Sequence, residues 1–281
     1  MQMKLAPWAL LAVAAMWGIS FVWMKDILDQ QDVYSFLTSR FLVAAAAMIL
    51  LKPKVLKAFN RELVFKGLIV GMALGSGYIF QTLGLERTTP AITGFITGLY
   101  VVFTPLIAAV VLKARITKLT WMCVGIATVG LALLSLQGWS IGFGELLVLG
   151  SAFGFGAHII ALGKWSNGRD AYAMTVVQLT VCAIMSGIAS IFEGGYQLPP
   201  DGGVWATVIF TAVICTAVAF VIQTWSQAHM TTTKVAVILT MEVVFAAVFA
   251  IVFGGETLTL QKALGGLLVL VAMFVIVTKE S

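Results

Sequence analysis

The stretch "FQTLGLERTTPA" (residues 80–91) returns in altered form as "IQTWSQAHMTTTK" (residues 222–234). Each copy contains a Gln-Thr pair followed by a group of threonines. Two further pairs of segments are related at a similar separation: "ALLAVAAMWG" (9–18) with "ELLVLGSAFG" (145–154), and "RITKLTWMCVG" (115–125) with "ETLTLQKALGG" (256–266). The sequence therefore predicts two related halves, residues 1–137 and 142–281.

Composition places both halves in a lipid bilayer. The mean hydropathy is +1.03 and only 10% of the residues are charged, whereas soluble domains carry about 25%. A helix needs about 20 apolar residues to cross the hydrocarbon core. Ten such runs lie at residues 5–25, 34–52, 66–86, 90–112, 120–137, 143–163, 171–193, 203–228, 234–253 and 261–278. We expect an all-α membrane protein with ten transmembrane helices, five in each half.

The distribution of charge predicts the orientation of these helices. The densest basic loops, residues 52–66 and 113–118, fall on the same side as both termini, and most acidic residues fall on the other. Lys and Arg are enriched in cytoplasmic loops, so both termini are expected in the cytoplasm. This topology accounts for the net charge of +5, and nucleic acid is not expected as a partner.

An odd number of helices in each half has a structural consequence. The second half must enter the membrane in the opposite orientation, which gives an inverted repeat. In this architecture a central site near the midplane is exposed to each side in turn. Gln81 is then expected toward the outer face and Gln223 toward the inner face, related by a pseudo-two-fold axis.

Motifs for chemistry on a substrate are missing from the sequence. It contains no GxSxG, HExxH, P-loop or CxxC motif, and its three cysteines all fall within predicted spans. We therefore expect no enzyme activity, no metal site and no cofactor, and interpret the chain as a protein that recognises a small-molecule substrate.

Residues spaced three or four apart select one face of each central helix. These faces carry aromatic and neutral hydrogen-bonding side chains. The predicted substrate site consists of Trp17, Phe21, Tyr78, Gln81, Thr97, Tyr100, Phe155, His158, Phe220 and Gln223. Such a lining suits a solute with a flat apolar side chain and a zwitterionic head, whose ring would stack on aromatic side chains while Gln, Tyr, His and indole donors meet its carboxylate. A phosphate ester or nucleotide sugar would require basic residues at the midplane, and none is expected there.

Several of these residues also have a purely structural interpretation. Trp17 can pack between helices rather than contact substrate. His158 can bind substrate or carry a proton near neutral pH, or it can hydrogen-bond a neighbouring helix. Gln81 and Gln223 can form gates, or interhelical bonds worth roughly 1 kcal/mol each.

One basic residue, one acidic residue and one proline well inside the predicted spans need a separate interpretation. At 1.5 Å per residue, Arg40 is expected about 9 Å below the outer edge, where we interpret it as structural. Its helix is nearly all aliphatic, which suits contact with lipid or with a second copy in a homodimer. Glu242 is the candidate for proton coupling, since intramembrane carboxyl groups are commonly functional. Pro105 removes a backbone bond and is a candidate hinge or a tolerated kink.

Four features together resemble the EamA-type branch of the drug/metabolite transporter superfamily: "MWGISFVWMK" (16–25), "RFLVAAAAMILL" (40–51), "LTMEVVFAAVFAIVFGGETLTLQKALGGLLVLVA" (239–272) and the ten-helix doubling. Within that branch the chain is similar to YddG-like bacterial aromatic amino-acid exporters. The resemblance implies two EamA-like repeats, a multi-pass protein of the bacterial inner membrane, and export of aromatic or apolar amino acids. Val243 departs from the family pattern, which often has Pro there, and Arg115 stands where the second half has Glu256.

Other functions remain open from the residues alone. A passive channel or facilitator would show no stimulation of flux by substrate on the far side. A membrane-embedded enzyme would need a nucleophile or metal cluster. An exporter of drugs or another small metabolite would accept amino acids poorly. Either a monomer or a homodimer fits the aliphatic outer helices.

Overall fold

The computed structural model describes residues 2–112, 117–137, 140–229, 235, 238–239, 241–257 and 259–279. These residues are almost entirely helical, and positions 234, 236, 237 and 240 of the expected span 234–253 lie outside them. The helices are α1 (Gln2–Leu28), α2 (Val33–Leu51), the 3-10 helix η1 (Pro53–Ala58), α3 (Arg61–Arg87), α4 (Pro90–Thr97), α5 (Tyr100–Leu112), α6 (Lys118–Ser135), α7 (Phe143–Trp165), α8 (Ala171–Phe192), α9 (Gly202–Ala212), the π-helix η2 (Val213–Val218), α10 (Ala219–His229), α12 (Met241–Val252) and α13 (Leu260–Lys279). Two short strands, β1 (Leu136–Gln137) and β2 (Ser140–Ile141), pair as a hairpin between α6 and α7.

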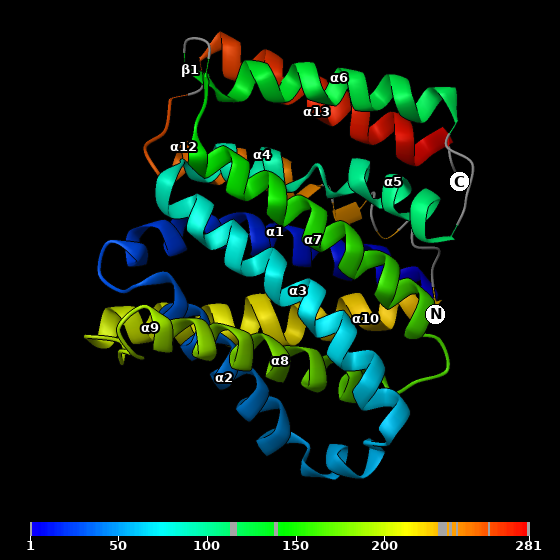
Figure 1. Cartoon of the computed structure of the whole chain (residues 1–281), viewed down its shortest axis with the longest axis vertical. Coiled ribbons are helices and arrows are strands. Elements are labelled where there is room, and N and C mark those ends of the chain that lie inside the picture. Colours follow the sequence, from blue (N-terminus) through cyan, green and yellow to red (C-terminus); the bar gives the residue numbers. More distant parts are fainter. Residues whose placement is uncertain are drawn as a thin grey trace.

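Seven helical segments of the described chain are long and apolar enough to cross a membrane. Shorter apolar helices cover Trp121–Gly130, Met241–Val252 and Leu260–Ala272. The expected all-α membrane protein is therefore confirmed, while the count of ten transmembrane helices stays a prediction. Figure 1 shows the start of α1 and the end of α13 on the same side of the molecule, which fits a shared location of both termini.

Polar residues fix where several helices begin. The side chains of Asp32, Asn60 and Asp170 each accept a hydrogen bond from a backbone N–H in the first turn of the following helix, at 2.8, 2.8 and 3.1 Å. Asp201 does the same for α9 through two N–H groups. Each such cap contributes about 1 kcal/mol. They mark the ends of membrane segments, where backbone donors would otherwise be unpaired.

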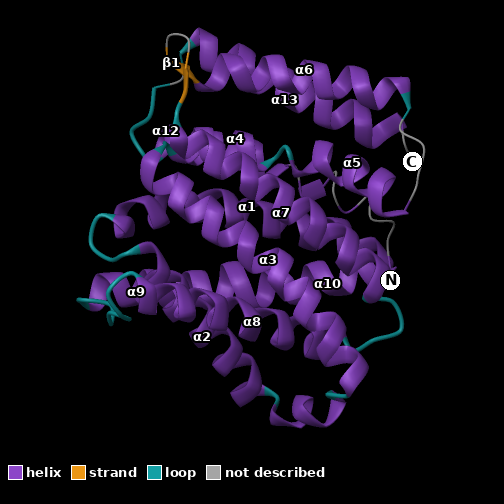
Figure 2. Cartoon of the chain, viewed as in Figure 1, coloured by secondary structure: helices purple, strands orange, loops and turns teal. Residues whose placement is uncertain are grey.

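The helices lie in layers along the long axis of the molecule (Figures 1 and 2). α6 and α13 pack side by side at one end, and α2, α8, α9 and α10 lie at the other. Between them, α1 packs on α12, and α7 packs on α3, α4 and α5. The inner layers therefore bring together helices from both halves of the sequence.

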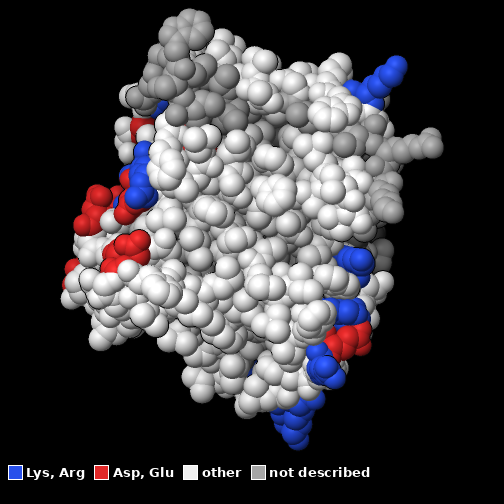
Figure 3. Space-filling view, viewed as in Figure 1, with Lys and Arg blue, Asp and Glu red and all other residues white. Residues whose placement is uncertain are grey.

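Charged side chains avoid the middle of the surface. Figure 3 shows Lys, Arg, Asp and Glu gathered toward the edges of this face, with a broad uncharged band between them. Large apolar side chains such as Leu50, Val110, Phe192 and Phe274 are exposed. Exposed apolar side chains are what contact with hydrocarbon requires.

Two helices expected to be continuous are interrupted. The span expected at 90–112 is divided into α4 and α5 at Gly98–Leu99, and helix α5 continues through Pro105. The hinge role of Pro105 stays a prediction, but the interruption itself lies elsewhere. The second interruption is the π-helix Val213–Val218 between α9 and α10, a feature that is frequent at functional sites.

Candidate functional site

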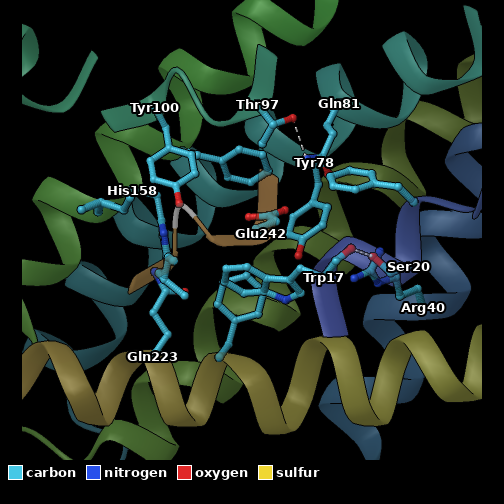
Figure 4. A pocket seen from close by; sticks show the side chains of 15 residues that line it. Trp17, Ser20, Arg40, Tyr78, Gln81, Thr97, Tyr100, His158, Gln223 and Glu242 are labelled. Carbon is cyan, nitrogen blue, oxygen red and sulfur yellow. Dashed lines mark hydrogen bonds between the residues drawn. The ribbon is translucent and has the colours of Figure 1, made fainter. Parts of the chain in front are cut away.

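A central cavity lies between helices of both halves, with about 490 Å³ of space free of protein atoms, including the solvent at its opening. Side chains from α1, α2, α3, α4, α5, α7, α10 and α12 surround it. It is lined by Trp17, Ser20, Phe21, Arg40, Tyr78, Gln81, Thr97, Tyr100, Phe155, His158, Ile159, Phe220, Gln223, Leu239 and Glu242. All ten residues of the predicted substrate site are among them, together with Glu242 (Figure 4).

The close approach of α3 and α7 brings two of the aromatic residues together. A Cβ atom on Gly154 would lie 2.9 Å from the backbone of Gly77, and a Cβ atom on Gly77 would lie 2.8 Å from the Phe155 ring. The residues that follow, Tyr78 and Phe155, meet edge to face with ring centroids 5.3 Å apart. Small residues at this crossing therefore position one aromatic wall of the cavity.

Phe220 connects this wall to the remaining aromatic residues. Its ring centroid lies 5.3 Å from that of Trp17, 6.0 Å from that of Tyr78 and 5.9 Å from that of His158. Most of these contacts are edge to face, the arrangement that aromatic pairs favour. The rings form one continuous apolar surface against which a flat side chain can pack.

Trp17 contributes its ring to this surface but not its donor. Its indole N–H donates to the backbone carbonyl of Cys215 at 2.7 Å. The expectation that the indole would meet a substrate carboxylate is therefore wrong, because the single donor of the indole is already used. Cys215 lies in the π-helix, which places its carbonyl within reach of α1.

His158 is held by a neighbouring helix. Its Nε2 atom lies 2.8 Å from Oε1 of Gln178 on α8, and the Gln178 amide in turn donates to Thr224 at 3.4 Å. Sequence reasoning did not single out Gln178, and it noted Thr224 only as part of the repeated Gln-Thr pair. The interhelical bond considered for His158 is thus present, and its ring also borders the cavity.

The two repeated glutamines differ in their bonding. Gln81 donates to Thr97 at 3.1 Å across the cavity wall. Within the described residues, Oε1 of Gln223 and the hydroxyl of Tyr100 are buried and form no hydrogen bond. Buried polar atoms in proteins are nearly always paired. These two groups are consequently the best placed to bond a solute.

Arg40 places a basic side chain in a cavity that sequence reasoning expected to be neutral. It is only 1% exposed and lines the cavity, although no basic residue was expected there. Its Nε donates to Thr216 at 2.8 Å and its Nη1 to the Met24 sulfur at 3.1 Å. Its guanidinium lies 4.9 Å from the centre of the Tyr78 ring. The helix α2 is also not a purely lipid-facing helix, because it packs on α8 and buries this side chain.

Glu242 supplies the second ionisable group of the cavity. It is 6% exposed, and Figure 4 shows its carboxyl group directed into the cavity, apart from Arg40. The ion pairs of the described residues lie at the surface, as between Lys52 and Asp170, and none joins Arg40 to Glu242. One guanidinium and one carboxyl group therefore border the same space without pairing.

Comparison with known proteins follows the division seen in the sequence. Residues 4–136 and residues 142–278 each match the EamA-like transporter family. The chain belongs to the EamA-like transporter family. It is accordingly a multi-pass membrane transporter, as the sequence predicted.

Individual relatives agree with this assignment and name no substrate. An uncharacterized transporter from Archaeoglobus fulgidus is 32% identical over 272 residues, covering 96% of this chain and 85% of the relative. A second uncharacterized transporter from that organism is 23% identical over 278 residues, covering 94% of each. A solved crystal structure is similar with a TM-score of 0.63 over 93% of this chain and 95% of its own, at 17% identity. That likeness concerns the fold alone.

Proposed function

We propose that this EamA-like protein is a secondary transporter of aromatic and apolar amino acids that works by alternating access through the central cavity. The observation that carries the proposal is the lining of that cavity. Ten side chains selected by helical spacing, from residues 17 to 223, border one space. A ring from the substrate would pack on the surface formed by Trp17, Tyr78 and Phe220, where aromatic pairs gain about 0.5–1.5 kcal/mol beyond burial.

Polar groups of the same cavity fit the head of an amino acid. The hydroxyl of Tyr100 can donate or accept, and Oε1 of Gln223 can accept from an ammonium group. Neither has a partner within the described residues. A purely apolar solute would leave both unpaired, which is unfavourable for buried polar groups.

Helix contacts support alternating access between two inverted halves, residues 1–137 and 142–281. In the first half α1 packs on α12 and α10 of the second, and α7 of the second half packs on α4, α5 and α3 of the first. Helices α2 and α8 pack on each other, as do α6 and α13. An exchange of the two halves therefore converts each of these contacts into another of them, as a pseudo-two-fold axis requires. Inverted repeats of this kind expose a central site to each side by rocking of one half against the other.

The proposal also includes coupling of transport to protons and the direction of transport. Glu242 is the carboxyl group placed to carry a proton into and out of the cavity, and His158 is the second candidate. Export, the bacterial inner membrane and cytoplasmic termini are taken from the family resemblance and from the distribution of Lys and Arg. Pro105 in α5 is proposed as a hinge near the interruption at Gly98–Leu99. Either a monomer or a homodimer is compatible with this function.

The test is flux of labelled phenylalanine in liposomes that carry the purified protein. Saturable uptake that tryptophan and tyrosine compete away is expected, and unlabelled substrate on the far side should accelerate it. Trp17→Ala should reduce uptake, whereas Trp8→Ala should not, because Trp8 lies on the same helix but is 71% exposed. His158→Ala tests a second side chain of the cavity lining.

Other results would assign a different function. Uptake without stimulation from the far side indicates a passive facilitator. No phenylalanine flux from folded protein removes aromatic amino acids and favours the export of drugs or another small metabolite.

A further inference from the structure

We propose that Arg40 binds a carboxylate of the transported substrate, so that the substrates of this protein are carboxylate-bearing compounds. The inference rests on the proposed function of the cavity as the substrate site. It adds a positively charged recognition residue to a site that the sequence predicted to be neutral.

The first argument is the charge of a buried guanidinium. Arg40 is 1% exposed, and Arg remains protonated in proteins. Its contacts are a hydroxyl of Thr216, the sulfur of Met24 and the ring of Tyr78, all of which are uncharged. Buried charges are normally paired with an opposite charge, and arginines within membranes mark substrate pathways. In the described chain no carboxylate lies within ion-pair distance of Arg40.

The second argument is the number of donors that remain. A guanidinium carries five N–H donors in a fixed fork. Thr216 accepts from Nε and Met24 accepts from Nη1, so three donors form no hydrogen bond within the described residues. A thioether is moreover a weak acceptor. A carboxylate can accept two parallel bonds from such a fork.

The third argument is orientation toward the cavity. Arg40 belongs to the cavity lining, and its guanidinium lies against the Tyr78 ring that also faces the space. Thr216 fixes the Nε side of the group. Figure 4 shows Arg40 at one side of the cavity, next to Ser20 and apart from Glu242. The residue is therefore held in place by neutral partners with its charge available to a solute.

The charged and ionisable groups of the cavity also indicate which carboxylate-bearing compounds would fit it. Glu242 borders the same cavity, and a carboxyl group accepts hydrogen bonds from an ammonium group. An ammonium group on a carboxylate-bearing compound can therefore lie toward Glu242 while the carboxylate bonds Arg40. Cationic drugs without a carboxylate are disfavoured by the guanidinium.

Binding to the purified protein in detergent tests the inference separately from transport. Equilibrium binding of labelled phenylalanine would be competed by 3-phenylpropanoate, which keeps the ring and carboxylate, and by phenethylamine, which keeps the ring and amine. We expect 3-phenylpropanoate to compete and phenethylamine to be at least about tenfold weaker, because a hydrogen-bonded charge is lost. Competition by phenethylamine equal to that by 3-phenylpropanoate overturns the inference without any variant.

Substitutions then assign the effect to Arg40. Arg40→Gln should weaken phenylalanine at least about tenfold and remove the preference for 3-phenylpropanoate over phenethylamine, and Arg40→Lys should restore part of it. Arg87→Gln is the matched control, since Arg87 lies at the exposed end of α3 and outside the cavity. Unchanged affinity in folded Arg40→Gln overturns the inference. If Arg40→Gln does not fold, the inference is tested by the competition of 3-phenylpropanoate and phenethylamine for the wild-type protein alone.

A thermal-shift panel separates failure of this inference from failure of the proposed substrate. Aliphatic amino acids and simple carboxylates are added to wild type and to Arg40→Gln, because a bound ligand raises the unfolding midpoint. If aromatic amino acids do not bind but another carboxylate stabilises wild type and not Arg40→Gln, Arg40 keeps its role and the aromatic specificity is wrong. If no carboxylate in the panel stabilises folded wild type, the inference is overturned.

Discussion

The indole N–H of Trp17 donates to the carbonyl of Cys215 at 2.7 Å, across 198 positions of sequence. This bond joins the first helix of the first half to the π-helix of the second half. The adjacent residue, Thr216, accepts from Arg40. One short segment thus fixes both an aromatic and a charged residue of the cavity.

Trp17→Phe is expected to lower stability as well as binding. The substitution keeps an aromatic ring but leaves the Cys215 carbonyl without its donor, which costs about 1 kcal/mol. The measurement is the thermal unfolding midpoint in detergent, followed by phenylalanine binding. Trp8→Phe serves as control because that side chain is exposed. Equal midpoints for Trp17→Phe and wild type would argue against an energetic role for the bond.

His158 and Gln178 should behave as a coupled pair. Their side chains bond at 2.8 Å between α7 and α8, so His158→Ala and Gln178→Ala should each destabilise the protein, and the double variant should cost less than the sum. Interhelical bonds in membranes give coupling of about 0.6–1.7 kcal/mol. A double-mutant cycle on unfolding free energies measures this quantity. Strict additivity would contradict the prediction.

Gly154→Ala should disturb the site from outside it. The added methyl group would lie 2.9 Å from the backbone of Gly77 and would force α3 and α7 apart. We expect a loss of about 1–3 kcal/mol, as for overpacking generally, together with weaker substrate binding because Tyr78 and Phe155 separate. Gly125→Ala on α6 is the control, since no atom lies within 4 Å of its added carbon. Wild-type affinity in Gly154→Ala would show that this crossing does not position the cavity.

Glu242→Gln tests proton coupling. The amide cannot exchange a proton, so uptake driven by a pH gradient should fall to the level without a gradient, while exchange of labelled for unlabelled substrate should continue. Liposome assays with and without an imposed gradient separate the two. Glu193→Gln is a suitable control because Glu193 lies exposed after α8. Gradient-driven uptake that survives in Glu242→Gln would assign coupling to another group.

The aromatic residues of the cavity were predictable because helical spacing fixes which side chains share a face. Phe155 and His158, three residues apart on α7, and Phe220 and Gln223, three apart on α10, follow this rule. Arg40 was not predictable in this way. A long side chain carries its charge several ångströms from its Cα, and the aliphatic residues around Arg40 in the sequence of α2 do not indicate that this side chain lines a cavity.

The two helix interruptions were missed for a related reason. Gly98 is one of many glycines in the spans, and the residues Val213–Val218 contain neither Gly nor Pro. Proline is the usual sequence signal for a break. The sequence analysis therefore predicted a hinge or kink at Pro105 and not at Gly98–Leu99. Tertiary contacts, such as those of Cys215 with Trp17 and Met16, accompany the π-helix instead.

The π-helix also determines which way the following helix faces. Each residue of an α-helix advances the chain by about 100° around the axis, and a π turn contains an additional residue. Helix α10 therefore begins with its face rotated by roughly that angle relative to an uninterrupted α-helix. Phe220 and Gln223 reach the cavity in this rotated setting. A change of register confined to one turn would swing both side chains away from the cavity while the axis of α10 stayed in place.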